Sequence, residues 1–313
     1  MKKLPALAFS LMILGIPSAA MAQHVVALFT PGLDFSDGSK RNEFINKIAK
    51  SLSEKTGEEW EGRAFARASD FESAKSGISL AILDADYFSA KGGSFKPVAM
   101  LSANGSTKRA MKVIAKKGSG TKLFHYRNKR FAVVASTSLT ASFITSSALG
   151  HEVKAASYFS TLDDVRDVRA AINAVDMGKD DLTLVFDGYD SGFATIYTTP
   201  AVGLPVLALN PAKFAGEDAD KLKAAAQNIS ANTSFITGTA PYSASDAAAY
   251  KNIAGSAKAA TLAYQPIESN ENIKIGVSVT SLNERGEGIL LNPFQVQYFP
   301  TITEFDKKLE ERL

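Results

Sequence analysis

The sequence predicts an α/β protein made of two units, followed by a C-terminal extension of different character. Apolar, strand-like runs alternate with runs of helical spacing between residues 25 and 115, and the alternation returns between residues 130 and 209. Beyond residue 254, apolar and polar residues alternate instead. The chain has 313 residues and is 45% hydrophobic, which suits one large or two small domains with a real core.

In the first unit, strands and helices follow one another in turn. Apolar residues recur at helical spacing over residues 44–52, and Gly57 follows them as a helix stop. Ser69 and Glu72 have the spacing of a capping box, which predicts a short helix beginning at Ser69. This order implies right-handed crossovers and a mainly parallel sheet. The expected strands are residues 25–29, 61–67, 79–83, 97–101 and 110–115.

The second unit repeats the alternation. We expect the helix at residues 140–149 to end at Gly150 and the helix at residues 164–177 to end at Gly178. A late strand then leads back toward the first unit, and an alanine-rich helix follows at residues 219–229. The expected strands are residues 130–135, 153–158, 182–186 and 204–209.

Residues 254–313 form the extension. Residues 273–280 and 288–299 alternate like two antiparallel strands, and Thr303 opens a final helix. Because an isolated two-stranded ribbon is barely stable in water, this ribbon has to pack against something. Two interpretations stay open: the tail covers the back of the first unit, or it leaves an edge exposed for a protein partner.

The first 22 residues have the three parts of a secretory signal peptide. Lys2 and Lys3 supply the positive start, and the apolar run at residues 4–16 is too short for a membrane span. Ala20-Met21-Ala22 then gives the small-x-small cleavage pattern. The alternative is a buried N-terminal helix. No cysteine follows the apolar run, which excludes a lipid anchor, so we expect a bacterial periplasmic protein.

Composition argues against several classes of function. The net charge of +3 falls close to neutral once Lys2 and Lys3 are removed, which disfavours a nucleic-acid or membrane-surface partner. The chain has no cysteine, so it has neither disulfides nor thiolate metal sites. Its three histidines, His24, His125 and His151, lie in no metal-binding or nucleophile pattern. We therefore expect no enzyme activity and no cofactor.

Two segments are candidates for ligand binding. Ser136-Thr137-Ser138 stands between a buried strand and a helix, where free N–H groups, hydroxyls and the helix dipole favour an anion. The alternative is ordinary capping of that helix. Asp84 and Asp86 follow a strand, where α/β proteins place ligand residues, although solvated carboxylates are as common there.

The order of these segments resembles the periplasmic solute-binding proteins of ABC importers, in the phosphate, phosphite and phosphonate branch of the two-lobed type II fold. The resemblance covers about residues 25–253. No single motif is specific, but their order and spacing together are moderately so. The motifs are Ala68-Ser69-Asp70-Phe71, residues 80–87 with Ala90, residues 123–134, Ser136-Thr137-Ser138, residues 171–175 with Gly178 and Asp181, Leu204-Pro205-Val206, and Asp246 with Tyr250.

The resemblance implies a division of the chain and a set of ligand-binding residues. Residues 23–112 and 205–253 would form lobe 1, and residues 113–204 lobe 2, after the signal peptide (1–22) and before the extension (254–313). A cleft between the lobes would bind a small anionic, phosphonate-like solute for an ABC permease. The ligand-binding residues would be Ser136, Thr137, Ser138, Tyr87, Phe71 and Asp84.

The chain also departs from the family pattern. Phe71 replaces a tyrosine hydroxyl, Leu139 replaces the glycine after Ser-Thr-Ser, and Asn128 replaces a glycine at the entry to lobe 2. A cleft histidine has no counterpart between Ser157 and Ala171. The alternative function is therefore a non-transport structural or regulatory periplasmic protein that docks a partner through the extension.

We predict that the exported protein begins at Gln23, because Ala20-Met21-Ala22 directly precedes it. Amino-terminal sequencing of the secreted protein should return Gln23. Recovery of Met1 would show that the apolar segment stays in the mature protein.

Overall fold

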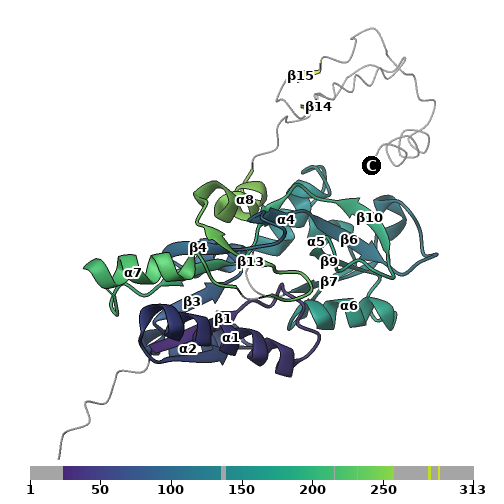
Figure 1. Ribbon diagram of the computed structural model, residues 1–313. Coiled ribbons are helices and arrows are strands. Elements are labelled where there is room, and N and C mark those ends of the chain that lie inside the picture. Colours follow the sequence, from purple (N-terminus) through teal and green to yellow (C-terminus); the bar gives the residue numbers. More distant parts are fainter. Residues whose placement is uncertain are drawn as a thin grey trace, which may run out of the picture.

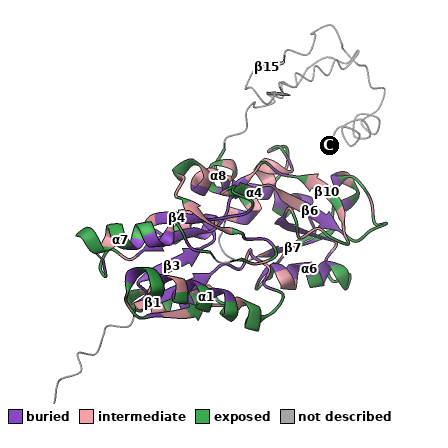
Figure 2. Cartoon of the chain, in the orientation of Figure 1, coloured by how far each residue is buried: buried purple, intermediate pink, exposed green. Residues whose placement is uncertain are grey.

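The computed structural model describes residues 24–134, 139–214, 216–230 and 232–256, and the backbone of residues 281–282 and 288–289. Two sheets, each flanked by helices, form two lobes that lie side by side (Figure 1). Buried residues are concentrated in the sheets and on the inner faces of the helices (Figure 2). The predicted signal peptide and most of the extension lie outside the described residues.

The first lobe is built on a six-stranded sheet in the order β13-β4-β12-β3-β1-β2. β1 pairs in parallel with β2 and β3, whereas β12 runs antiparallel to β3 and β4, so the expected parallel sheet is in fact mixed. Every residue of β3 and β12 is buried, as in strands covered on both faces. The strands are β1 His24–Phe29, β2 Trp60–Ala64, β3 Leu80–Leu83, β4 Lys96–Ser102, β12 Val206–Leu209 and β13 Gly238–Pro241.

Helices cover both faces of this sheet because side chains alternate along each strand. Val26 and Leu28 of β1 pack in one cluster with α1 (Gly38–Thr56) and α7 (Gly216–Ala226). Ala27 and Phe29 point to the other face, toward α2 (Ala68–Ala74) and α3 (Ala85–Lys91). A short 3-10 helix, Lys75–Gly77, follows α2.

The starts of the two helices after β1 and β2 show different capping. The Asp37 side chain accepts a hydrogen bond from the backbone N–H of Lys40 and so caps α1. The capping box expected at Ser69 is wrong: α2 begins one residue earlier, with Arg67 at the cap position and no side-chain cap bond. The Ser69 hydroxyl instead donates to the Asp70 carboxylate within the first turn.

The second lobe has a five-stranded sheet in the order β10-β6-β9-β7-β8. β7 pairs in parallel with β8 and β9, and β6 pairs antiparallel with β9 and β10. The strands are β6 Met111–Ala115, β7 Arg130–Val134, β8 Thr161–Val165, β9 Leu182–Phe186 and β10 Ala194–Thr198. The helices are a 3-10 helix Leu123–Tyr126, α4 Leu139–Ser147, α5 Ala155–Tyr158 and α6 Val168–Asp176.

Two sequence predictions in the second lobe are wrong. The strand expected at residues 153–158 is the short helix α5, whose Ala155 and Tyr158 are buried. The helix expected from residue 164 begins only at Val168, because Asp164 and Val165 belong to β8. The Asp167 carboxylate accepts from the N–H of Ala170 and so fixes the start of α6.

The chain crosses between the lobes through two very short strands. β5 (Lys108–Arg109) and β11 (Val202–Gly203) pair antiparallel with each other and with no strand of either large sheet. Gly203 lies against α8 (Ala244–Ala254), where an added Cβ would come 2.4 Å from the backbone oxygen of Asp246. The crossing therefore requires glycine at this position. The predicted lobe boundary between residues 112 and 113 falls within β6.

Helix α8 follows β13 of the first sheet, but it also touches the second lobe. Its Tyr250 ring stacks on Phe143 of α4, with ring centroids 4.0 Å apart and planes at 9°. Figure 1 shows α8 directly beside α4. Beyond residue 256, the structure describes only β14 (Ser281–Leu282) and β15 (Gly288–Ile289), which pair antiparallel. The predicted strand at 273–280 and the predicted final helix lie outside the described residues.

The second lobe contains a buried carboxyl that should destabilise it at neutral pH. The Asp180 side chain is fully covered, and neither of its oxygens has a hydrogen-bond donor. Burial and the neighbouring Asp163 raise the pKa of Asp180 to about 6, although Arg130 acts against them. The folded state therefore holds this proton more tightly than the unfolded state, so stability falls as pH rises from about 4 to about 7.

We predict that Asp180→Asn raises the free energy of unfolding at pH 8 by up to about 3 kcal/mol. The gain should vanish below about pH 4, where the wild-type carboxyl is protonated in both states. Urea unfolding across this pH range measures the difference, with the exposed Asp176→Asn as the matched control. A gain that is independent of pH would contradict the assignment.

Candidate functional site

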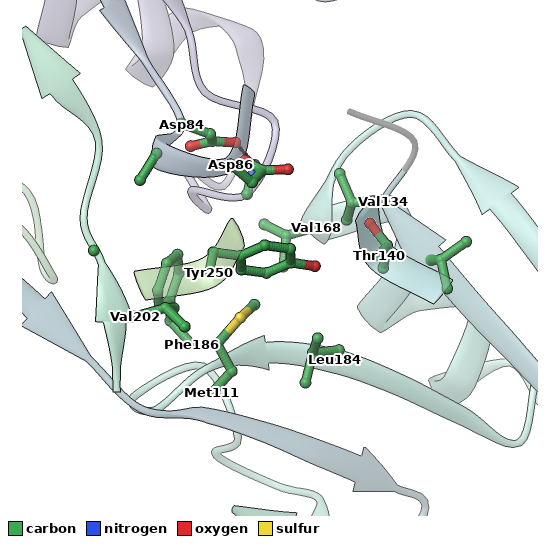
Figure 3. A pocket seen from close by; sticks show the side chains of 14 residues that line it. Asp84, Asp86, Met111, Val134, Thr140, Val168, Leu184, Phe186, Val202 and Tyr250 are labelled. Carbon is green, nitrogen blue, oxygen red and sulfur yellow. Dashed lines mark hydrogen bonds between the residues drawn. The ribbon is translucent and has the colours of Figure 1, made fainter. Parts of the chain in front are cut away.

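A small cavity lies between the two lobes beside the chain crossing (Figure 3). Its volume of about 50 Å³ holds a few water molecules, since each needs at least about 10–15 Å³. The lobes thus meet around a narrow space. The lining residues are Gly32, Asp84, Ala85 and Asp86 from lobe 1, Met111, Val133, Val134, Thr140, Val168, Leu184 and Phe186 from lobe 2, Val202 and Gly203 from β11, and Tyr250 from α8.

Asp84 is the most unusual group in this wall. It follows β3 directly and precedes α3, at the carboxyl end of a strand, where α/β proteins bind ligands. The residue is only 6% exposed. One carboxylate oxygen, Oδ2, accepts from the Gly32 N–H at 2.7 Å, whereas Oδ1 is buried and has no hydrogen-bond partner. A Cβ at Gly32 would lie 3.0 Å from Oδ2, so any larger residue there would crowd this carboxylate.

The surroundings of Asp84 favour its neutral form. Burial raises the pKa of Asp84 well above its ordinary value, and the charge of Asp86 adds to the rise. The Gly32 N–H and the Arg41 guanidinium oppose it but do not cancel it. Burying a carboxyl oxygen costs free energy unless a hydrogen-bond donor reaches it.

The rest of the wall is mainly apolar and aromatic. Tyr250 is buried, and burial raises the pKa of its hydroxyl above the ordinary range. Its hydroxyl faces Thr140, while its ring is held by the stack on Phe143. Tyr250 was predicted only as part of a motif with Asp246 and not as a residue of the site. Its signal was weak because α8 is alanine-rich and has little apolar periodicity.

The loop between β1 and α1 makes non-covalent contacts with the second lobe. The backbone oxygen of Pro31 accepts from the N–H of Val168, at 2.9 Å. The Asp34 carboxylate pairs with the Arg169 guanidinium at 2.7 Å, and the N–H of Asp34 donates to the Tyr189 hydroxyl at 3.2 Å. We call these three contacts the interlobe latch. Arg41 adds a longer pairing with Asp167, at 3.4 Å.

Of the six residues predicted for the site, the three that the structure describes, Asp84, Phe71 and Tyr87, do not all lie at the cavity. Asp84 lines the cavity. Phe71 and Tyr87 are fully buried on the far side of the first sheet, where both rings pack against Phe29 and the Tyr87 hydroxyl donates to Glu72. Neither lines the cavity, because α2 and α3 turn these side chains into the lobe core.

The Ser136-Thr137-Ser138 segment lies outside the described residues, so its role stays a prediction. Val134 and Thr140, on either side of it in sequence, both line the cavity.

The described wall contains two carboxylates and no lysine, arginine or histidine. Among the described residues, no three histidine, cysteine, aspartate or glutamate side chains are grouped so that they could hold a metal ion. The same part of the chain contains no helix that is long and apolar enough to span a membrane. The wall thus offers hydrogen-bond acceptors and apolar contacts.

Solved structures share this fold at low sequence identity. The XAC2383 protein of Xanthomonas citri bound to ATP matches with a TM-score of 0.56 and 12% identity, over 74% of this chain and 96% of that one. A binding-protein component of an ABC phosphonate transporter from Pseudomonas aeruginosa gives 0.59 and 10%, over 74% and 85%. The PhnD1 protein of Prochlorococcus marinus in complex with methylphosphonate gives 0.59 and 12%, over 74% and 97%.

These likenesses confirm the predicted fold, the two-lobed α/β fold of periplasmic binding proteins. No family model and no curated protein sequence matches the chain. The fold is therefore established by shape.

We predict that Asp34→Asn opens the lobes. The substitution removes the charge that pairs with Arg169, whose side chain is 43% exposed, so unfolding should become easier by less than about 1 kcal/mol. The radius of gyration from small-angle X-ray scattering should nevertheless increase. Asp70→Asn, in α2, is the control. Identical scattering curves for Asp34→Asn and wild type would show that the latch does not hold the lobes together.

Proposed function

We propose that this protein captures a small solute between its lobes without chemical change and delivers it to an ABC permease. The observation that carries the proposal is Asp84, a buried carboxyl with an unpartnered oxygen at the wall of an interlobe cavity. A polar group in this position gains a hydrogen bond when a ligand fills the cavity. The shared fold supports the proposal, because a structural neighbour is a binding component of an ABC transporter.

Capture would work through closure of the lobes. The short strands β5 and β11 are the connection about which the lobes can turn. The interlobe latch forms only when the β1–α1 loop reaches the start of α6. A solute that touches both walls would therefore favour the closed arrangement. Capture requires binding but no chemical step. The only reactive groups among the described lining residues are carboxylates and hydroxyls.

The predicted anionic, phosphonate-like solute rests on Ser136, Thr137 and Ser138, which would lie at the helix start. The described wall does not add to that prediction, since it contains two carboxylates and no basic side chain. The small, largely apolar cavity also favours a second candidate function. In that case the protein is a structural or regulatory periplasmic protein that docks a partner through residues 254–313.

Native mass spectrometry of protein purified from its own cellular compartment distinguishes the two functions. Capture predicts an additional mass from a retained small solute, which disappears after unfolding and refolding. A chain that carries no small molecule under the gentlest conditions, but does carry another protein, would favour the docking function. Removal of residues 254–313 then provides the control, because it should abolish docking and leave solute retention unchanged.

A further inference from the structure

We propose that Asp84 binds a protonated primary amine of the captured solute. This inference rests on the proposed function and adds the chemical class of the ligand. It starts from a single unsatisfied atom, the Asp84 Oδ1, which is buried in the wall and has no hydrogen-bond partner. An alkylammonium group carries three N–H donors and a positive charge, so it can satisfy this oxygen and offset the cost of burying the carboxylate.

The charges of the wall favour a cation over an anion. Asp84 and Asp86 stand close together on the lobe 1 side, and the described lining has no positively charged side chain (Figure 3). Arg41 is near enough to affect Asp84 but does not line the cavity, and its guanidinium reaches toward Asp167 instead. An ammonium group beside Asp84 would stabilise the ionised carboxylate over the neutral form that burial favours, whereas an anion would disfavour ionisation further.

The remaining lining fits the body of an amine. Tyr250 and Phe186 present aromatic rings to the cavity, and aromatic faces attract cations. Met111, Val168 and Leu184 supply the apolar surface that a short alkyl chain would contact. The narrow space between the two walls suits a small amine-bearing end of the solute.

Hydrogen-bond donation distinguishes a primary amine from other cations. A quaternary ammonium ion has the same charge but no N–H group, so it would leave Asp84 Oδ1 unsatisfied. A neutral alcohol can donate to Asp84 but lacks the charge. The affinity for a primary alkylammonium ion should therefore be compared with the affinities for a quaternary ammonium ion, an alcohol and an alkylphosphonate.

Isothermal titration calorimetry on the mature chain, residues 23–313, freed of any retained solute by unfolding and refolding, tests the inference. The probes are propylammonium, tetramethylammonium, propanol and methylphosphonate at constant ionic strength. We expect propylammonium to bind, and the other three to bind at least about ten-fold more weakly, as the loss of one charged hydrogen bond implies. Asp84→Asn should weaken propylammonium binding by a similar factor, and the exposed Asp176→Asn should not.

The inference is wrong if methylphosphonate or propanol binds as tightly as propylammonium, if no probe binds, or if Asp84→Asn keeps the wild-type affinity. The probe series on wild type gives an answer even if the variant does not fold. A retained solute that lacks an amine would overturn the inference and leave capture standing. If protein purified from its own cellular compartment retains no solute, that result would count against the proposed capture function, whichever of the four probes bind.

Discussion

The two sheets are joined by β5 and β11, two strands of two residues each, and this narrow connection decides where a ligand can bind. The chain leaves lobe 1 through β5 and returns through β11, so every element of lobe 2 lies between these crossings. The crossings are held against α8, where Gly203 meets the backbone of Asp246 and the Thr107 hydroxyl donates to the Asp246 carboxylate. Because the connection is short and anchored on one side, it limits how the lobes can approach each other.

Closure of the lobes is supported by weak contacts. The Asp34–Arg169 pair is partly exposed, and such pairs contribute about 0–1 kcal/mol. At the same time, the Asp84 carboxyl is buried with one oxygen that lacks a donor, which costs free energy in the arrangement that the structure shows. A solute that supplies the missing donor would remove this cost. Under the proposed function, this one side chain would couple solute binding to lobe closure.

The sequence was most informative where hydrophobic runs are long and bounded. β9 was predicted residue by residue, and the periodic helix around residue 48 was found, because burial on one or both faces imposes a clear pattern. Residues 153–158 were misassigned because the helix here, Ala155–Tyr158, is a single turn and is too short to show a helical period. Helix α8 was missed as an element, since alanine gives little contrast between its faces.

The candidate site was less predictable because it depends on direction as well as position. Asp84 and Tyr87 are three residues apart, yet one lines the cavity and the other fills the lobe core. The difference arises because the chain turns from β3 into α3 between them, which a linear pattern does not reveal. The unpaired oxygen of Asp84 and the stacking of Tyr250 on Phe143 are tertiary facts that join residues far apart in the chain.

The distance between the lobes, measured with and without solute, tests the central claim most directly. The chain has no cysteine, so Glu54→Cys in α1 and Met177→Cys beside α6 would carry spin labels at two exposed positions, one on each lobe. Double electron–electron resonance should give a long, broad distance distribution for the solute-free protein and a shorter, narrower one after the retained solute is restored. One unchanged distance in both states would contradict capture by lobe closure.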